Sequence, residues 1–307
     1  MQIVSGPTAA AKAKPAISFW RGLTRRKKTD PPVVLPGVWD GVSARLVASH
    51  GFEAGLVGGY HVGATVGSAE PLLTATELVE TCRRIRRATD MPLRIDVGAG
   101  FGDPIHVAQL VRDLMQVGVE AISIEDQVFP KQAHYHNDYR EQVIPIPRMV
   151  DKLRLARETG GDQLYLCART DSFSVGGIDE VVERCTAYLA AGADAVQVFP
   201  PTLELATATP SRIPGPVWYA NTRGNRVGRP VLTPVQAREL GYVGLAEGHA
   251  LFFAAYRAMM EAAKAFSPVD GLVARPDDID VKRAIESALG LDRLYRIEAE
   301  TILADRG

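Results

Sequence analysis

The sequence lacks the features that mark disulfide-stabilised, zinc-binding and membrane proteins. Its 307 residues include three cysteines, which are scattered, odd in number and never spaced as CxxC, so we expect neither a disulfide framework nor a metal knuckle. No apolar run approaches the roughly 20 residues of a membrane span, and the N-terminus has no apolar core of signal-peptide length. We therefore expect a soluble, cytoplasmic protein with no membrane partner.

A surplus of charge of either sign is also missing. Lys and Arg total 35, Asp and Glu total 36, and the formal net charge is -1. This balance provides no electrostatic field that would attract nucleic acid. The basic cluster at residues 21–30 is interpreted as part of a solvated N-terminal arm or a subunit contact, and no nucleic-acid partner is expected.

Short apolar runs alternate with longer amphipathic segments between about residue 33 and residue 265. The amphipathic segments, such as TATELVETCRRIRRA, predict helices. The apolar runs predict eight strands, at residues 33–39, 54–58, 93–97, 121–125, 164–169, 195–199, 217–221 and 243–247. Eight such units predict an α/β fold, a closed parallel (β/α)8 TIM barrel, because parallel strands need helical crossovers and closure removes both sheet edges. A doubly wound open sheet is the alternative, but no GxGxxG follows an early strand.

The chain is expected to divide into three parts. Residues 1–30 form the N-terminal arm, residues 31–267 the barrel and catalytic domain, and residues 268–307 a linker with a helical extension. An extra C-terminal helix has no place in the ring of a completed barrel, so we expect it to pack on a neighbouring subunit or on the outside of its own barrel. A homo-oligomer is therefore predicted.

Polar residues follow most of the predicted strands, at the end of a barrel where active sites are built. Several carboxylates and one arginine facing one mouth predict an oxygen-lined site for Mg2+ or Mn2+, and a 2-oxo acid could chelate such an ion. Arg169 would bind a second anionic group in a bidentate manner. Any single acid could instead cap the following helix, as the position of Asp40 suggests. The strand-end residues are Asp40, Gly58, Gly59, Asp96, Glu125, Asp126, Arg169, Asp171, Asn221, Glu247 and His249.

Five segments together resemble a known superfamily. They are LPGVWDGVSARLVASHGFEAGLVGG, RIDVGAGFGDP, IEDQVFPK, CARTDS and AGADAVQVFP, in that order, and they resemble the signature segments of the isocitrate lyase and phosphoenolpyruvate mutase superfamily. The resemblance implies a (β/α)8 barrel, usually tetrameric, whose extra C-terminal helix is exchanged between subunits. It also implies Mg2+-assisted formation or cleavage of a C–C or C–P bond next to a 2-oxo acid, through an enolpyruvate-like intermediate.

The resemblance also assigns roles to residues of this chain. The direct metal ligand falls on Asp96, and the acids that reach the metal through water fall on Glu125 and, with Asp replaced by Glu, on Glu70. The substrate-binding groups fall on Arg169, Asn221 and the backbone amides near Gly58 and Gly59. A small carboxylate is therefore the expected substrate.

Two departures from the family pattern concern the chemistry. Family members usually carry a second acid two residues after the metal-binding Asp, and this chain has Gly98 there, which should weaken Mg2+ binding. Lyases that cleave isocitrate or methylisocitrate have an Arg-Cys-Gly-His run after the lysine, whose Cys is the general acid. Here Lys131, itself a candidate catalytic residue, is followed by Gln, Ala and the run His134, Tyr135, His136, so no thiol is available.

Three functions are compatible with this pattern. The first is a Mg2+-dependent C–C lyase acting next to a 2-oxo or 2-hydroxy carboxylate, in which His134, Tyr135 or His136 transfers the proton that Cys transfers elsewhere. The second is a phosphonate mutase or hydrolase, in which Arg169, Arg223 and Arg226 bind phosphonate oxygens. The third is a barrel with weak metal binding and a non-lyase or binding role. The first is favoured, because the sequence EDQVFPK is closer to the C–C branch.

Overall fold

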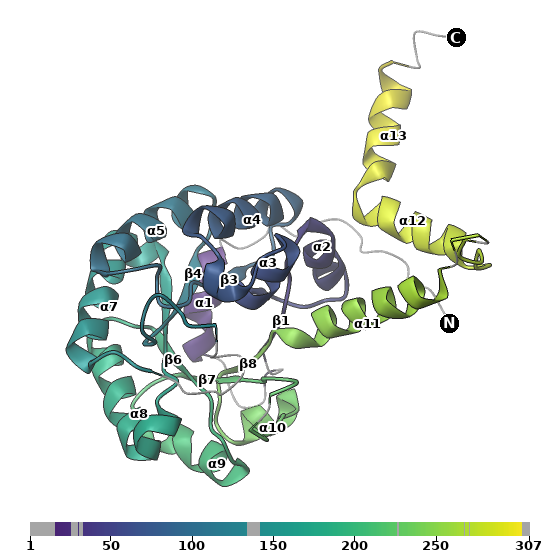
Figure 1. Ribbon diagram of the computed structural model, residues 1–307. Coiled ribbons are helices and arrows are strands. Elements are labelled where there is room, and N and C mark those ends of the chain that lie inside the picture. Colours follow the sequence, from purple (N-terminus) through teal and green to yellow (C-terminus); the bar gives the residue numbers. More distant parts are fainter. Residues whose placement is uncertain are drawn as a thin grey trace.

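The eight predicted strands are confirmed, and they form a nearly closed parallel barrel surrounded by helices (Figure 1). The computed structural model describes residues 16–25, 30, 33–133, 142–225, 227–266, 268–269 and 271–302. The strands are β1 Val33–Pro36, β2 Gly55–Val57, β3 Leu93–Asp96, β4 Ala121–Glu125, β5 Tyr165–Arg169, β6 Ala195–Val198, β7 Val217–Ala220 and β8 Gly244–Glu247. The predicted TIM-barrel class is correct, and the open-sheet alternative is wrong.

Strand pairing runs in the order β1-β8-β7-β6-β5-β4-β3-β2, with every ladder parallel. The remaining gap between β1 and β2 is bridged where the backbone N–H of Val38 donates to the carbonyl of Leu56 at 2.8 Å. The position of Gly37 at this point requires glycine for a steric reason. A Cβ there would lie 1.9 Å from the carbonyl oxygen of Gly248, so only glycine permits this close approach of the two chain segments.

Helices follow the strands and cover the outside of the barrel. They are α2 Gly41–Ser49, α3 Gly59–Thr65, α4 Ala75–Ala88, α5 Pro104–Gln116, α7 Ile146–Gly160, α8 Phe173–Ala190, α9 Leu203–Arg212 and α10 Pro234–Glu239, with 3-10 turns η1 Leu23–Arg25, η2 Glu70–Leu72 and η3 Gly161–Gln163. Helix α11 His249–Ala265 follows β8 but projects away from the barrel, and none of its residues is buried (Figure 1). Asp40 does cap α2, because its side chain accepts from the backbone N–H of Ser43 at 2.7 Å. This acid therefore has a structural role.

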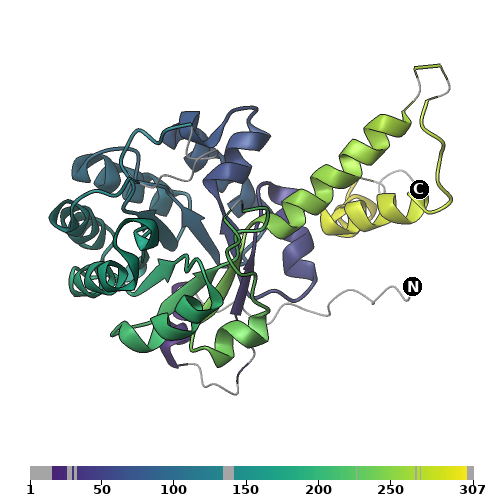
Figure 2. The ribbon, with the colours of Figure 1, turned by 60° about the horizontal axis from the view of Figure 1, so that its bottom comes forward.

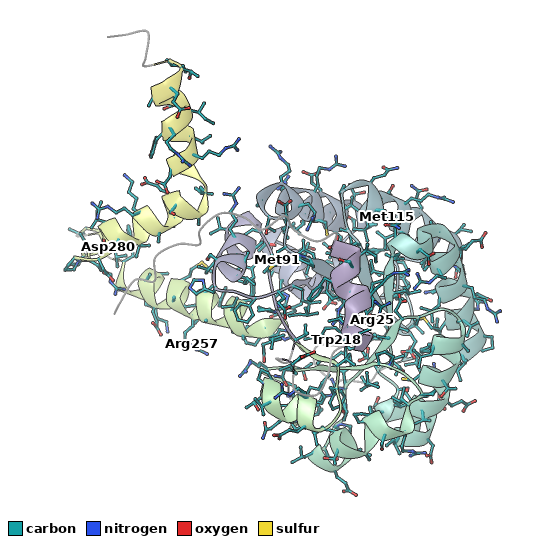
Figure 3. All side chains as sticks on the ribbon, turned by 180° about the vertical axis from the view of Figure 1, so that it is seen from behind. Arg25, Met91, Met115, Trp218, Arg257 and Asp280 are labelled. Atoms are coloured by element: carbon teal, nitrogen blue, oxygen red, sulfur yellow. The ribbon has the colours of Figure 1, made fainter. Side chains whose placement is uncertain are left out.

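The end of the barrel at the start of the strands is closed by helix α1 (Ala16–Gly22). Trp20 is fully buried, and its ring stacks on Tyr165 with centroids 5.4 Å apart and lies 6.5 Å from Trp218. From behind, α1 crosses the barrel near Trp218 (Figure 3). The described part of the predicted N-terminal arm is thus packed rather than solvated, because its aromatic side chains complete the barrel core. The carboxyl ends of the strands lie at the opposite end of the barrel.

The C-terminal extension leaves the barrel after α11 (Figure 2). It contains two helices, α12 Asp278–Ala288 and α13 Leu291–Glu300, where the sequence predicted one helical stretch. The break falls at Gly290, whose φ of 78° lies in the left-handed region that glycine adopts without strain. Helix α12 lies beside α2 of its own barrel, and there Arg45 donates to the carbonyl of Ala288 at 2.6 Å. Among the described residues, no helix combines the length and apolar character needed to cross a membrane.

Candidate active site

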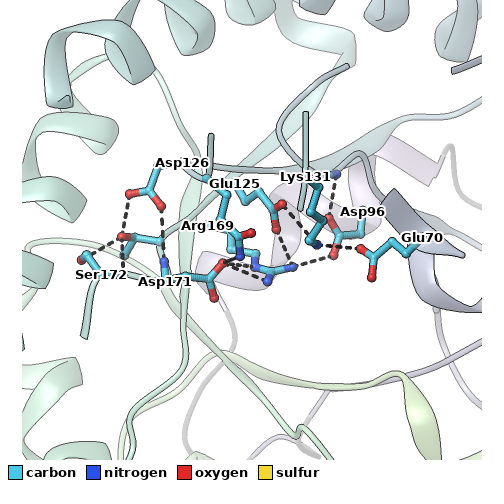
Figure 4. Close-up of polar contacts among 11 residues, drawn as sticks. Glu70, Asp96, Glu125, Asp126, Lys131, Arg169, Asp171 and Ser172 are labelled. Carbon is cyan, nitrogen blue, oxygen red and sulfur yellow. Dashed lines mark hydrogen bonds and ion pairs between the residues drawn. The ribbon is translucent and has the colours of Figure 1, made fainter. Parts of the chain in front are cut away.

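Arg169 lies at the centre of a cluster of acids at the carboxyl ends of β3, β4 and β5 (Figure 4). Its Nη1 contacts Asp96 Oδ2 and Glu125 Oε2, each at 3.0 Å, and its Nη2 contacts Asp171 Oδ2 at 2.9 Å. The guanidinium also lies over the ring of Phe199, 4.5 Å from the centroid, as cation–π contacts prefer. Residues up to 75 positions apart thus meet because parallel strands end at one mouth.

A second cation, Lys131, joins this cluster from the segment that follows β4. Its Nζ lies 2.7 Å from Glu70 Oε1 and 3.4 Å from Glu125 Oε1. Glu70 comes from η2, after β2, so the ammonium group links two sides of the mouth. The structure therefore brings together five residues that the sequence placed in the site, namely Glu70, Asp96, Glu125, Lys131 and Arg169.

Glu125 has the most perturbed environment among these acids. It is fully buried, and neither carboxylate oxygen accepts a hydrogen bond from a described residue, so its contacts with Arg169 and Lys131 are ion pairs without hydrogen-bond geometry. Burial raises the pKa of Glu125 to about 7. Arg169 and Lys131 lower this pKa, whereas Asp171 and Asp96 raise it further. Burial dominates because it penalises the charged form of the carboxyl group.

The cluster opens into a cavity of about 300 Å³. Its lining includes the predicted substrate-binding residues Gly58, Gly59, Arg169, Asn221 and Arg223. A smaller cavity of about 40 Å³ adjoins it and is lined by the metal-binding candidates Glu70, Asp96 and Glu125, together with Gly98 and Lys131. A volume of about 300 Å³ lies at the lower end of the range for small-molecule pockets.

Two of the predicted substrate-binding side chains have partners within the protein. Asn221 donates to Glu247 Oε2 at 2.7 Å and to the carbonyl of Leu232 at 2.9 Å. The Arg223 guanidinium is paired with the same carboxylate, at 2.6 Å and 3.2 Å. Both residues line the cavity, but Glu247 holds them in place. The positive charge that the sequence placed here with Arg223 is therefore neutralised.

A match with a family model decides the family of this chain. Residues 23–267 match the model described as phosphoenolpyruvate phosphomutase. The chain belongs to this family. Its (β/α)8 fold and the arrangement of acids around Arg169 agree with the resemblance found in the sequence, and the chain is a member of the isocitrate lyase and phosphoenolpyruvate mutase superfamily.

Relatives within the superfamily include lyases and also a phosphorylmutase. The 2,3-dimethylmalate lyase of Eubacterium barkeri is 31% identical over 274 residues, which cover 88% of this chain and 93% of that protein. The petal death protein of Dianthus caryophyllus is 33% identical over 245 residues, 76% of this chain and 73% of that protein. A crystal structure of 2,3-dimethylmalate lyase superposes with a TM-score of 0.81 at 27% identity, over 94% of this chain and 99% of that one. At this general level the chain is a lyase of the superfamily.

Lyases of this superfamily are generally Mg2+-dependent, so the acids of the site must be compared with the needs of that ion. In the described part of the chain, no three His, Cys, Asp or Glu side chains group closely enough to hold a metal by themselves. Mg2+ does not require such a trio, because it keeps several waters and binds through one or two carboxylates. Four carboxyl groups meet two side-chain cations here, which leaves a surplus of negative charge even when Glu125 is protonated. The donor set therefore fits a hydrated divalent cation.

Some of the sequence-predicted residues fall outside the site or outside the described residues. Asp126 follows Glu125 but does not join the cluster around Arg169. Its Oδ2 accepts hydrogen bonds from Thr170 at 2.7 Å, Tyr188 at 2.8 Å and Arg184 at 3.1 Å. This strand-end acid is structural. His134, Tyr135, His136 and Arg226 lie outside the described residues.

Residues that the sequence analysis did not assign also line the cavity. They are Tyr60 and His61 from α3, and Gln197 and Phe199 from the end of β6. His249 from α11, which the sequence placed at a strand end without a role, lines it too. The signal for the first two was present in the sequence GGYHVG, immediately after a predicted strand. A tyrosine and a histidine at the end of a strand could equally be part of the hydrophobic core. Only the cavity in the structure shows that they line a possible binding site.

Proposed function

We propose that this protein is a lyase that cleaves, or in reverse forms, a C–C bond adjacent to a 2-oxo or 2-hydroxy carboxylate. One observation carries the proposal. Arg169 is fixed by Asp171, Asp96 and Glu125, lies on Phe199 and lines the cavity. A guanidinium held in this way is pre-organised to bind a planar carboxylate without losing side-chain freedom.

The other residues of the mouth have complementary roles in this proposal. Backbone N–H groups near Gly58 and Gly59 bind the oxygens of the oxo acid, because no side chain at these positions blocks the approach. Lys131 is held by Glu70 at 2.7 Å, where its ammonium group stabilises negative charge that develops on substrate oxygens. Asn221, fixed by Glu247 and Leu232, positions the substrate from the β7 side.

We propose that Mg2+ binds directly to Asp96 and, through water, to Glu70 and Glu125. When bound, the ion supplies positive charge beside the oxygen at which an enolate develops. Gly98 provides no carboxylate for this shell, so binding should be weaker than in relatives that have an acid there. Mn2+ could replace Mg2+, since both prefer oxygen ligands.

Proton transfer requires a group that replaces the cysteine of related lyases. We propose that one of His134, Tyr135 and His136 does this, because the segment that carries them starts directly after Lys131, which is part of the mouth. A histidine has a suitable pKa for general acid–base catalysis at neutral pH. Replacing His134 and His136 singly with Asn, and Tyr135 with Phe, should lower kcat at least tenfold for one of the three.

The proposal is tested by turnover. The purified protein should release a 2-oxo acid or a carboxylate from at least one member of a panel of malate derivatives and short 2-oxo dicarboxylates, followed by 1H NMR with Mg2+ present. Arg169→Lys should reduce kcat/KM by about 100-fold, since Lys cannot bind a carboxylate in a bidentate manner. Arg25→Lys, on the surface at the other end of the barrel, should leave it unchanged.

A phosphonate substrate is the alternative that this test also addresses. It needs extra positive charge at the cavity, and the Arg223 guanidinium is already paired with Glu247. The C–C reaction is therefore favoured. Release of phosphate from a phosphonate, with no turnover of any carboxylate in the panel, would overturn the proposal. No turnover of either kind would favour a binding role for the barrel.

We further propose that the protein is a homo-oligomer, a dimer or a tetramer, in which α12 and α13 pack on a second copy. These helices project from the barrel (Figures 1 and 2), and they expose large apolar side chains at Ile285, Leu289, Leu294, Tyr295 and Ile297. A contiguous exposed apolar face marks an interaction site.

A further inference from the structure

Two histidines on one side of the cavity have ring nitrogens with no partner in the described protein. His61, in the first turn of α3, is only 2% exposed, and no described residue forms a hydrogen bond with its Nδ1 or its Nε2. His249, the first residue of α11, has a buried Nδ1 that is likewise unpartnered. Both side chains line the cavity of about 300 Å³, and their rings are 5.1 Å apart.

Glycines make room for this pair. A Cβ at Gly58 would lie 2.8 Å from His61 Nδ1, and a Cβ at Gly248 would lie 3.2 Å from its Cε1. The imidazole thus occupies space that side chains at the ends of β2 and β8 would otherwise fill. Aromatic rings then fix its orientation, since Tyr60 and Phe252 meet His61 edge-on at 5.7 Å and 5.1 Å.

Both imidazoles are neutral at physiological pH. Burial lowers the pKa of His61 to about 3, with a further lowering by His249 and an opposing effect of Glu70. Burial also lowers the pKa of His249, against the carboxylates of Glu70 and Glu247. A neutral imidazole has one N–H donor and one acceptor. Leaving such groups buried without hydrogen bonds is unfavourable, so a molecule in the cavity is their natural partner.

The position of the pair relative to Arg169 indicates which part of a ligand it meets. In the barrel, β5 lies across from β1, and β1 is flanked by β8 and β2. Arg169 ends β5, whereas His249 follows β8 and His61 follows β2. The histidines and the arginine therefore face the cavity from opposite sides.

We propose that His61 and His249 bind the polar group at the end of the substrate remote from Arg169, and that they select a short 2-hydroxy or 2-oxo dicarboxylate over the matching monocarboxylate. This inference deepens the proposed lyase function and rests on it for the role of Arg169. His61 donates its imidazole N–H to the second carboxylate, which a methyl group could not accept. His249, whose ring is also hydrogen-bonded to the backbone of Asn221, presents its unpartnered Nδ1 to the same group. The two histidines are thus specificity-determining residues.

The test compares two ligands that differ only at this end. Malate and 2-hydroxybutyrate share the 2-hydroxy acid and have a carboxylate or a methyl group, respectively, at C4. Titration calorimetry with the full-length protein should give at least tenfold tighter binding of malate, as expected for hydrogen bonds to a charged group. His61→Phe and His249→Phe, which keep a ring in place, should each remove most of this preference. His50→Gln, at the exposed end of α2, is the control and should keep it.

Oxalate binding tests the proposed role of Arg169 without testing the role of the histidines, because oxalate is too short to span the cavity between them. If both Phe variants bind malate as tightly as the unchanged protein does, the inference is wrong, while oxalate binding that depends on Arg169 still supports the proposed site. If malate binding depends on the histidines but no 2-hydroxy or 2-oxo acid is turned over, the inference stands and the lyase proposal fails.

A second measurement observes the unchanged protein and uses substituted proteins only to assign its signals. The protein has six histidines, and 15N NMR of their ring nitrogens reports tautomer and hydrogen bonding. Malate should shift the ring signals of two neutral histidines, assigned by their loss in His61→Gln and His249→Gln, and 2-hydroxybutyrate should shift them less. Ring signals that malate leaves in place would overturn the inference.

Discussion

Glu125 is the residue whose ionisation most affects this site. Its pKa of about 7 in the folded protein lies above the ordinary value of 4.5, chiefly because of burial. Relative to a permanently neutral side chain, the charged form therefore costs stability. That cost is absent at low pH and grows as the pH rises through about 7.

Glu125→Gln tests this linkage. Gln is neutral at every pH and has the shape of the protonated acid, so the variant and the unchanged protein should be equally stable at pH 4, below the ordinary pKa of 4.5. At pH 8.5 the variant should be more stable by about 3 kcal/mol, because the pKa of Glu125 is about 7 in the folded protein and 4.5 in the unfolded one. Urea unfolding at both pH values measures the difference. A variant that is equally stable at pH 8.5 would show that Lys131 and Arg169 fully compensate the buried charge.

Gly98 determines how much negative charge surrounds a bound cation. Its φ of 53° lies in the left-handed region, which Asp and Asn tolerate better than other residues, and a Cβ there would meet only Glu125 Oε1, at 3.7 Å. Gly98→Asp should tighten Mg2+ binding roughly tenfold, since affinity follows ligand charge. Gly98→Asn has the same shape and strain without the charge, and it should change binding by less than threefold. Calorimetric titration with MgCl2 at pH 8 distinguishes them, and equal affinities would contradict the metal assignment.

Backbone hydrogen bonds hold together the two ends of the loop that follows β4. The carbonyl of Asp126 accepts from the backbone N–H of Ile144 at 2.7 Å, and Val128 donates to Gln142 at 2.9 Å. The Asp126 side chain is fully buried and accepts from Arg184, Tyr188 and Thr170, given above. Lys131 lies on the same loop, at the mouth of the barrel. The contacts of Asp126 therefore help to position Lys131, which Asp126 does not contact.

Asp126→Ala should destabilise the protein by roughly 3 kcal/mol, because it removes the buried carboxylate that accepts from Thr170, Tyr188 and Arg184 and leaves Glu180 as the remaining acid beside Arg184. Differential scanning calorimetry and urea unfolding measure the loss. Asp162→Ala is the matched control, since it breaks an ion pair with Arg21 whose acid is 90% exposed, and it should cost less than about 1 kcal/mol. Equal effects of the two substitutions would show that the buried network contributes nothing specific.

At the scale of the whole molecule, α11 to α13 extend beyond the barrel and are exposed along most of their length. If α13 packs on a second copy, Leu294→Glu combined with Ile297→Glu should convert the oligomer to a monomer, because each charge would be buried in an apolar interface. Light scattering after size-exclusion chromatography gives the mass. Ile105→Glu, on the outer wall of the barrel, is the control and should keep the oligomer. A monomeric unchanged protein would contradict the proposal.

Much of this architecture followed from the sequence because its signals are local. Each predicted strand is a short apolar run, and each strand lies within two residues of its predicted bounds at both ends except β1, which ends at Pro36 rather than at residue 39. The acids around Arg169 were also predictable, because the ends of parallel strands share one mouth whatever the helices between them. The division of the extension at Gly290 was missed, since a single glycine within a helical pattern does not by itself end a helix.

The sequence by itself determined the barrel, the end at which the site lies, and the residues that line its acidic side. Only the tertiary structure decided how those charges are distributed. In the folded protein Arg223 is paired with Glu247, Asp126 is paired with Arg184, and His61 lies beside His249, 188 positions later in the chain. Local patterns fix strands and helices because these depend on neighbouring residues. Closure of the barrel fixes the pairing of charges and the burial that shifts their pKa values, because both depend on side chains that are distant in the sequence.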